Sequence, residues 1–425
     1  MKIALYLLTI FTPLLCCGKS WTPVANLDSS KEWLSQPTAR IDAKGNAVVA
    51  WQTETQGIFA SRFDSKSQQW QTSVVISLPH SKCGNPNMSM DRAGNALAIW
   101  GGDNFAAAYY DALSNQWSPP LVLGKCGGSA LPHVSFFPNG NAMAVWLNEA
   151  TQSIQTVYFD KALQKWTDPI SVFTNVVTSG FHNFCFKMDQ AGNGCVIWTE
   201  NGVNKPLLKG GFYNYETRIW SAAMDVAEAS MFNGINLFYK SNGNAVIIWG
   251  ELLDLTNAVL GNEYEAKTLN MLKNRAILSL GGFPRVDAKA SEFMGLSSIM
   301  GPQFTGGAAI LDEDLELQLS DLLVWQEFAV FHDIGLDDRG NAIVAWNERG
   351  AMTVEKIAHY NADKKAWKIV KEFSESEEGL GITKVDMHSK GPAVIVWDSF
   401  DEQAGNHVIK AVVYRPKSKA HKRKS

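Results

Sequence analysis

A ten-residue pattern recurs along almost the whole chain and limits its fold more than any other feature. The full pattern is Asp-x-x-Gly-Asn, then a short apolar run, then a Trp nine positions after the Asp. Six copies keep at least the Gly-Asn and the Trp: residues 42–51, 91–100, 137–146, 189–198, 240–249 and 337–346. A seventh, at 386–397, is read as keeping the Asp and the Trp, with two extra residues in the turn and Pro392 in place of the Asn. Repetition at about fifty residues indicates a ring or stack of identical supersecondary units.

The spacing of the motif tryptophans sets the number of units. Most neighbours lie 46 to 52 residues apart, but Trp249 and Trp346 are separated by 97 residues, which is close to two periods. The segment 285–289 (Arg-Val-Asp-Ala-Lys) falls where a degraded copy should lie. We therefore predict eight units. The alternative is seven units with an irregular insertion between residues 250 and 327.

Each unit reads as a four-stranded antiparallel sheet. An alternating segment precedes the Gly-Asn turn and an almost unbroken apolar run follows it, which predicts a hairpin whose second strand is covered on both faces. A third, alternating segment and a fourth that starts with Trp complete the unit, as at 58–63 and 70–76. Units of this kind form the blades of a β-propeller. The predicted fold is all-β, a single β-propeller of four-stranded blades.

The two ends of the chain complement each other. Residues 19–27 look like a fourth strand with no unit before it, whereas the last unit stops after its third strand at 407–414. We predict that the N-terminal strand completes the last blade and closes the ring, which leaves no free sheet edge there. The propeller would then span residues 19–415 as one domain.

Thirteen of the fifteen tryptophans occupy two repeated positions. Seven end the second strand of a unit: Trp51, Trp100, Trp146, Trp198, Trp249, Trp346 and Trp397. Six start a fourth strand: Trp21, Trp70, Trp117, Trp166, Trp220 and Trp367. Because a buried Trp removes a large apolar area from water, we predict that these side chains pack between blades rather than bind a ligand.

Over residues 21–414 the chain resembles exported bacterial β-propeller proteins built from Asp-x-x-Gly-Asn-Ala-x-Ala-x-Trp repeats. The resemblance implies the fold and export from the cell, but it implies no activity. Other propeller signatures fit less well. The sialidase Asp-box places its Trp closer to its Asp, and the quinoprotein repeat has Thr-Gly after its Asp.

The termini indicate export. Residues 1–18 contain a Lys near the start, an apolar run from 3 to 15 and small residues at the end, which is typical of a cleaved secretory signal. The alternative is a lipoprotein signal with Cys17 as the lipidated residue. Residues 416–425 form a basic tail that we expect to be disordered. The formal net charge is −4, and no basic face for nucleic acid is predicted.

Cysteine and histidine spacing does not match any metal-binding motif, so the sequence predicts no metal site and no cofactor. Cys83 and Cys126 both lie in connections between successive units, where a disulfide is geometrically feasible in an oxidising compartment. Cys185 and Cys195 lie on the two strands of one hairpin. We expect them to be three residues out of register and to remain buried thiols.

Two sets of charged residues are the candidate binding groups. Every clear copy has an acid within three residues of its Trp, on loops that share one face of a propeller: Glu54, Asp103, Glu149, Glu200, Glu251, Glu348 and Asp398. An acidic surface of this kind would attract cations or a basic partner. Basic residues two positions before the motif Asp are predicted to line the central channel: Arg40, Lys187, Arg285 and Lys384. The alternative is that both sets are ordinary solvated charges.

The repeated residues are all explained by turns and packing, so the sequence favours a binding function over catalysis. The first reading is a non-catalytic interaction scaffold of the cell envelope or secreted space. Its partner would be a protein or a glycan, and the chain would be a monomer that touches a membrane only through a lipid anchor. The alternatives are a lectin-like glycan binder and a glycan-active enzyme with a site near the irregular region 250–327.

Overall fold

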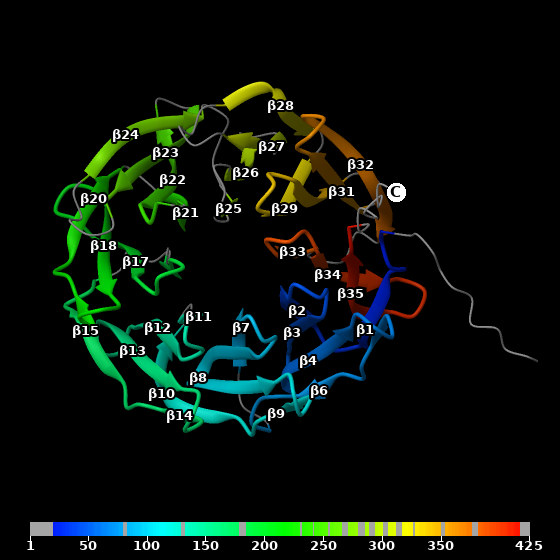
Figure 1. Cartoon of the computed structure of the whole chain (residues 1–425), viewed down its shortest axis with the longest axis horizontal. Coiled ribbons are helices and arrows are strands. Elements are labelled where there is room, and N and C mark those ends of the chain that lie inside the picture. The colour runs from blue at the N-terminus through cyan, green and yellow to red at the C-terminus, as the bar shows by residue number, and fades with distance from the viewer. Residues whose placement is uncertain are drawn as a thin grey trace, which may run out of the picture.

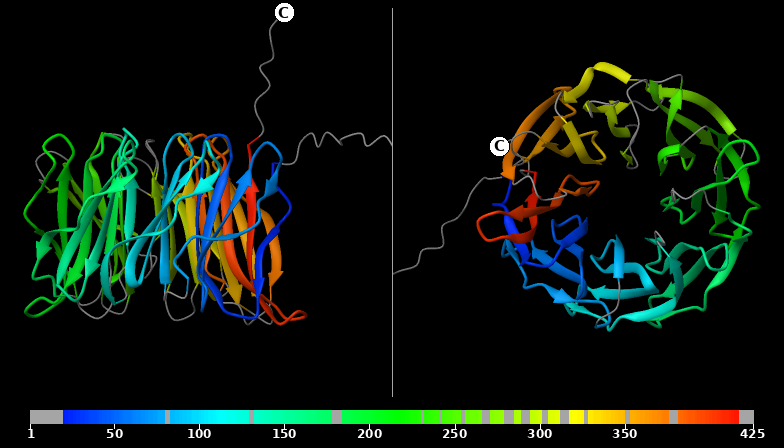
Figure 2. Two further views of the ribbon diagram at one scale, coloured as in Figure 1. Left: turned by 90° about the horizontal axis from the view of Figure 1, so that it is seen from below. Right: turned by 180° about the vertical axis from the view of Figure 1, so that it is seen from behind.

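The computed structural model describes residues 20–79, 83–128, 132–177, 184–229, 232–240, 242–253, 256–265, 271–278, 285–288, 294–300, 305–311, 317–325, 328–349, 353–375 and 381–416. These residues form strands and turns without any helix. Their strands build eight antiparallel sheets, which stand side by side in a ring around a central opening (Figure 1). The strands run between the two flat faces of the ring (Figure 2). This arrangement is the predicted β-propeller.

The sheets are numbered here as blades in chain order. Blade 1 contains β2 (Leu34–Ile41), β3 (Ala47–Thr53), β4 (Gly57–Asp64), β5 (Gln69–Trp70) and β6 (Val74–Val75). Blade 2 contains β7 (Cys83–Met90), β8 (Ala96–Asp111), β9 (Gln116–Trp117) and β10 (Leu121–Gly128). Blade 3 contains β11 (His133–Phe136), β12 (Ala142–Asn148), β13 (Ser153–Asp160), β14 (Lys165–Trp166) and β15 (Ile170–Thr174). Blade 4 contains β16 (Phe184–Met188), β17 (Gly194–Glu200), β18 (Leu207–Asn214), β19 (Ile219–Trp220) and β20 (Met224–Glu228).

The second half of the chain repeats this plan. Blade 5 contains β21 (Phe232–Tyr239), β22 (Ala245–Leu253), β23 (Thr256–Tyr264) and β24 (Met271–Leu278). Blade 6 contains β25 (Arg285–Ala288), β26 (Met294–Met300), β27 (Thr305–Leu311) and β28 (Leu317–Trp325). Blade 7 contains β29 (Phe328–Leu336), β30 (Ala342–Arg349), β31 (Thr353–Asn361) and β32 (Ala366–Glu375). Blade 8 contains β33 (Thr383–Met387), β34 (Ala393–Asp401), β35 (Asn406–Tyr414) and β1 (Ala25–Ser30).

Consecutive blades touch through their first strands, which lie nearest the centre of the ring (Figure 1). The contacts run from β2 to β7, β7 to β11, β11 to β16, β16 to β21, β21 to β25, β25 to β29, β29 to β33 and β33 back to β2. The ring is therefore continuous around its inner edge.

The N-terminal strand closes the ring, as predicted. β1 pairs antiparallel with β35, and Trp21 forms a further bridge with Tyr414. The described strand is 25–30, slightly later than the predicted 19–27. Asp28 on β1 also accepts a hydrogen bond from Trp51 Nε1 of blade 1 at 2.9 Å. The two ends of the propeller are thus joined within blade 8 and from blade 8 to blade 1.

The motif Asp orders the hairpin turn with both of its carboxylate oxygens. In blade 1, Asp42 Oδ1 accepts hydrogen bonds from the backbone N–H groups of Lys44 and Asn46, both at 2.8 Å. Its Oδ2 accepts from Asn46 Nδ2 at 2.7 Å. The same three bonds recur around Asp91, Asp189 and Asp337. One carboxylate therefore satisfies three donors that the turn would otherwise leave unpaired.

The motif Asn joins the hairpin to the end of the third strand. Its Oδ1 accepts from a backbone N–H just beyond that strand, at 2.9–3.1 Å, in five pairs: Asn46 with Ser65, Asn95 with Ala112, Asn141 with Lys161, Asn193 with Tyr215, and Asn341 with Ala362. A carboxamide is needed because the residue must donate to the Asp and accept from the third strand at once.

The motif Gly is required for two reasons, which Gly94 illustrates. Its φ is +89°, a conformation that L side chains rarely adopt. A Cβ added there would also lie 3.2 Å from Asp42 Oδ2 in the preceding blade. The turn of one blade thus sits closely against the turn of the next.

The last motif copy is in register with the others, so the predicted two-residue insertion is wrong. His388 N donates to Pro392 O and Gly391 N donates to His388 O, which is the bonding of Asp42 with Asn46 and Gly45 in blade 1. His388 therefore holds the Asp position, and its Nδ1 accepts from Lys390 N at 3.1 Å.

Asp386, which the sequence suggested for the turn, instead bonds to the neighbouring blade. It lies on β33, where its Oδ2 accepts from the backbone N–H of Ile41 in blade 1 at 2.8 Å. Asp333 on β29 likewise accepts from Val385 N of blade 8 at 3.0 Å. Since innermost strands are sheet edges with unpaired N–H groups, these carboxylates join neighbouring blades along the channel.

Blade 5 also lacks the motif Asp, and a carboxylate from its third strand takes the place of the missing one. In blade 5, Lys240 holds the Asp position, and Glu263 at the end of β23 supplies the acceptor. Glu263 accepts from Asn244 Nδ2 at 2.8 Å and from Lys240 Nζ at 2.9 Å. The acceptor for the Asn is retained although the residue that provides it has moved to a different strand.

All seven motif tryptophans are buried, at 4% exposure or less. Several contact an aromatic ring of the preceding blade. Trp146 stacks on Phe105 with ring centroids 4.2 Å apart, and Trp397 stacks on Phe373 at 5.4 Å. These positions are packing positions, as the sequence predicted.

Replacing Asp337 with Ala should lower the free energy of unfolding by about 2–3 kcal/mol, because three turn donors lose their acceptor. Urea unfolding followed by tryptophan fluorescence measures the change. Asp338→Ala is the matched control, since Asp338 is the exposed neighbour and should change stability by no more than about 0.5 kcal/mol. Equal effects of the two substitutions would contradict the role assigned to the motif carboxylate.

Candidate functional site

The loops at the ends of the strands form two faces of the ring (Figure 2). The motif turns and the turns between third and fourth strands lie at one end, called here the motif-turn face. The loops between second and third strands and the connections from blade to blade lie at the other end, called the connection face. This division follows from the antiparallel order of each sheet.

The predicted acidic residues lie towards the connection face, but their surroundings differ. Glu54 is exposed, whereas Glu149 and Glu251 are half-buried. The side chain of Asp103 lies outside the described residues. Glu200, Glu348 and Asp398 turn into their blades, as their contacts show below. A shared acidic binding surface stays a prediction.

Glu200 and Glu348 each accept a hydrogen bond from the motif Trp of their own blade. Trp198 Nε1 donates to Glu200 Oε1 at 2.6 Å, and Trp346 Nε1 donates to Glu348 Oε1 at 2.7 Å. Each carboxylate also meets a lysine from the third strand: Lys209 lies 3.2 Å from Glu200, and Lys356 lies 2.5 Å from Glu348. A cationic ligand would have to displace these lysines.

Asp398 on β34 is a buried carboxyl group of blade 8, with 4% exposure. It accepts from Ile382 N at 2.7 Å. Burial raises its pKa to about 7, although backbone hydrogen bonds from Ile382 and Gly381 act in the opposite direction. A second buried carboxylate, Glu355 of blade 7, accepts from Thr383 Oγ1 of blade 8 at 2.8 Å. This polar contact lies in the seam that also holds the stack of Trp397 on Phe373.

The predicted channel residues lie on innermost strands, but they do not form one level. Arg40 on β2 and Lys187 on β16 stand two residues before the Asp position. Lys384 on β33 stands four residues before it, because His388 holds that position. The side chain of Arg285 on β25 lies outside the described residues. Channel lining by these residues stays a prediction.

His133 on β11 packs against Phe184 of the next blade, with ring centroids 5.6 Å apart. Burial lowers its pKa to about 4, and the charges of Lys187 and Arg40 act in the same direction. A hydrogen bond with the Phe184 backbone opposes the shift. The ring is therefore uncharged near neutral pH and adds no charge to the inner edge.

Cys185 and Cys195 are two residues out of register, not three, because Cys185 pairs with Ile197 and Cys195 pairs with Lys187. Both side chains are buried in the layer between blades 4 and 5. Burial raises the pKa of the Cys195 thiol well above its usual value. The Cys83–Cys126 disulfide stays a prediction, since the Cys126 side chain lies outside the described residues, as does Cys17.

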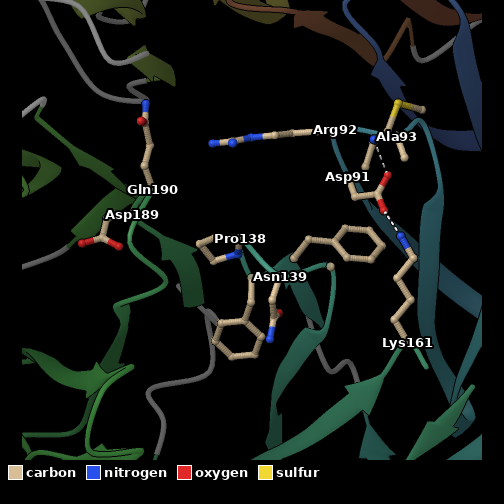
Figure 3. Close-up of a pocket in the computed structure, with 12 residues that line it drawn as sticks. Asp91, Arg92, Ala93, Pro138, Asn139, Lys161, Asp189 and Gln190 are labelled. Atoms are coloured by element: carbon tan, nitrogen blue, oxygen red, sulfur yellow. Dashed lines mark hydrogen bonds and ion pairs between the residues drawn. The ribbon is translucent and has the colours of Figure 1, made fainter. Parts of the chain in front are cut away.

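A cavity of about 330 Å³ opens on the motif-turn face where the turns of blades 2, 3 and 4 meet (Figure 3). Its walls are the segments 90–93, 136–140 and 189–190, together with Lys161. We call it the three-blade pocket. None of the residues singled out from the sequence as binding groups lies in it.

Three polar side chains of the three-blade pocket are available to a ligand. Arg92 and Gln190 are exposed, and neither side chain bonds to another described residue. Asn139 uses its Oδ1 to accept from Asn141 N at 3.0 Å, which leaves its Nδ2 group for a ligand. Figure 3 shows Arg92 extending across the opening towards the turn that carries Gln190.

The carboxylates of the pocket are already engaged by the turns. Asp91 accepts four hydrogen bonds, including one from Lys161 Nζ at 2.9 Å. Lys161 comes from blade 3, so this contact bridges two blades. Asp189 accepts three hydrogen bonds from its own turn. Neither carboxylate is placed to exchange a proton with a ligand without opening its turn.

The pocket also has an apolar wall. Phe136 is half-buried and packs against the core layer between blades 2 and 3. Pro138 is exposed beside it, and Met90 is half-buried. An apolar wall with a few convergent polar groups is typical of small-ligand sites.

The sequence contained a signal for this site that residue-by-residue reasoning missed. The two positions between the motif Asp and Gly vary from copy to copy, whereas the Gly and the Trp repeat. The first of the two is Ala43, Arg92, Pro138, Gln190, Ser241, Asp338 and Ser389, counting His388 as the last Asp position. Three consecutive members of this series line the pocket. Variation at a fixed place in a repeat marks residues that the fold does not need.

Among the described residues, no group of three or more His, Cys, Asp or Glu side chains is arranged to hold a metal ion. The described part of the chain contains no helix that is long and apolar enough to cross a membrane.

No family model matches the chain, and no curated protein matches it either. Solved structures do. A polysaccharide lyase of family PL25, an ulvan lyase bound to -[GlcA(1-4)Rha3S]-, has a TM-score of 0.51 at 10% identity, covering 91% of this chain and 95% of that one. The polysaccharide lyase Uly1 has a TM-score of 0.51 at 8% identity, with coverage of 80% and 91%. A prolyl endopeptidase has a TM-score of 0.51 at 11% identity, with coverage of 88% and 55%. These similarities are of fold alone, and the fold serves different chemistries.

The buried Asp398 should make stability depend on pH. Its folded pKa of about 7 lies above the unfolded value of 3.8, so the folded state binds the proton more tightly. Its contribution to stability is therefore fully present below about pH 4 and is lost as the pH rises to about 7. Relative to Asp398→Asn, the wild-type protein should lose unfolding free energy across this window. A constant difference in urea unfolding between pH 4 and 8 would contradict the assignment.

Proposed function

We propose that this protein is a non-catalytic binding module of the cell envelope or secreted space, and that it holds a short saccharide segment in the three-blade pocket. The observation that carries the proposal is that the polar groups of the pocket fall into two sets, one bonded within the protein and one available to a ligand. The carboxylates serve the turns, whereas Arg92, Gln190 and Asn139 remain free to donate hydrogen bonds.

The groups that face the pocket suit binding better than catalysis. Hydrolysis of a glycosidic bond needs two carboxyl groups, one to donate a proton and one to act as nucleophile or base. Asp91 and Asp189 are fixed by four and three hydrogen bonds. Most side chains of the sector 250–327, where the sequence left room for an enzyme site, lie outside the part of the chain that the structure describes.

A saccharide fits the chemistry of the walls. Amide groups such as those of Gln190 and Asn139 donate to and accept from hydroxyl groups. Phe136 and Pro138 offer apolar surface to the C–H face of a sugar ring. The volume of about 330 Å³ is at the lower end of the range for small-ligand sites, about 300–1,000 Å³. Two solved structures of similar fold are polysaccharide lyases, so the ring geometry is compatible with carbohydrate ligands.

A protein partner on the connection face is the second candidate. Glu54 is exposed there, and exposed acidic groups attract basic partners. Export and residence in the envelope rest on residues 1–18, which lie outside the described residues. A lipid anchor at Cys17 would keep the protein at a membrane; without it the protein would be released.

The test is binding of the mature protein, residues 19–425, to an oligosaccharide array. Gln190→Trp places a bulky side chain in the mouth of the three-blade pocket and should lower the signal at least about tenfold, since the ligand loses its space. Gln403→Trp is the matched control, because Gln403 is exposed in the loop between β34 and β35, on the connection face. It should bind as the wild type does.

A silent array, or array binding that Gln403→Trp abolishes and Gln190→Trp does not, would overturn the proposal. Binding to a protein from envelope extract that depends on Glu54 would favour the scaffold on the connection face instead.

A further inference from the structure

We propose that the three-blade pocket selects anionic saccharides, and that Arg92 binds their carboxylate or sulfate group. This inference rests on the proposed function, because it names the ligand class of the same site. Its first support is the position of Arg92, which is exposed and extends across the mouth of the pocket (Figure 3).

The second support is the charge balance around Arg92. The two cavity carboxylates are the natural partners for its guanidinium, but both are engaged elsewhere. Asp91 accepts hydrogen bonds from Lys161 Nζ and from three donors of its own turn. Asp189 accepts hydrogen bonds from three donors of its own turn. The guanidinium is thus the one charged group among the described pocket residues that has neither an ion pair nor a side-chain hydrogen bond to another described residue.

The third support is chemical fit. A guanidinium presents parallel N–H donors that match the two oxygens of a carboxylate or sulfate group, and such charge-assisted pairs are stronger than neutral ones. Gln190 and Asn139 lie on the neighbouring turns, where they can bond to hydroxyl groups of the same ligand. An acidic sugar residue carries both kinds of group, so one ring can engage all three side chains.

The fourth support is that the site occurs once among the clear copies. At the place held by Arg92, no other clear copy has a basic residue; the others are Ala43, Pro138, Gln190, Ser241, Asp338 and Ser389. The repeated frame therefore supplies one cationic pocket rather than one for each blade. Calorimetry should give one ligand per chain.

The experiment compares oligosaccharides that differ in charge, by calorimetry on the full mature chain. The probes are hexauronates from pectate and alginate, a sulfated galactan hexasaccharide, and neutral cello- and mannohexaose. At least one anionic probe should bind more tightly than every neutral probe, and its affinity should fall as salt is raised.

Arg92→Gln keeps hydrogen-bonding capacity but removes the charge, and should weaken binding of that probe about tenfold to a hundredfold. Arg92→Lys should lose less, since the charge remains. Arg339→Gln is the matched control. Arg339 is an exposed arginine in the motif turn of blade 7, on the same face but outside the pocket, and the variant should bind as the wild type does.

The outcomes separate the two proposals. If neutral probes bind as tightly as anionic ones and Gln190→Trp abolishes binding while Arg92→Gln does not, the pocket binds saccharides but the charge selection is refuted. If no probe binds, both proposals fall. Selection of the sulfated probe over the uronates, or the reverse, supports the inference and identifies the anionic group. Because Arg92 is exposed, its variants should keep the thermal midpoint of the wild type.

Discussion

Satisfaction of the backbone donors in the motif turns is the constraint on which each blade with a described motif turn depends. A tight turn leaves several N–H groups without a strand partner. Asp42 and its equivalents solve this with one carboxylate. In blade 5 the backbone N–H of Asn244 donates to Asn242 Oδ1, and Glu263 from another strand accepts from the Asn244 side chain. Blade 8 uses the imidazole of His388. What is retained is an acceptor in the right place, not a residue type.

This distinction explains how far the sequence could predict the fold. Hairpins, buried tryptophans and closure by the N-terminal strand follow from residue spacing, which the structure keeps. The last copy was misread because Asp386 looked like the motif Asp, while the true position held His388. Asp386 is used instead to join β33 to the backbone of Ile41. A contact between residues at opposite ends of the chain is not visible in a local pattern.

The candidate site was harder to predict, for a physical reason. Sequence spacing places Glu200 and Glu348 near a loop but does not say which way their side chains turn. The nearby Trp Nε1 groups need acceptors when buried, and so draw these carboxylates into the blades. Arg92 had no such neighbour. Its side chain stays outside because the turn amides and Lys161 have already occupied Asp91.

Repetition and function therefore use different positions of the same unit. The Asp, Gly, Asn and Trp positions are fixed by hydrogen bonds, positive φ and packing, and any change there costs stability. The position after the Asp meets none of these demands, so it can vary without harm to the frame. Three adjacent turns with Arg92, Pro138 and Gln190 at this position meet around one cavity. Among the described residues, a nearly symmetric ring thereby acquires an asymmetric pocket, which we propose as the binding site. The repeated residues would provide its rigidity and the unrepeated ones its selectivity.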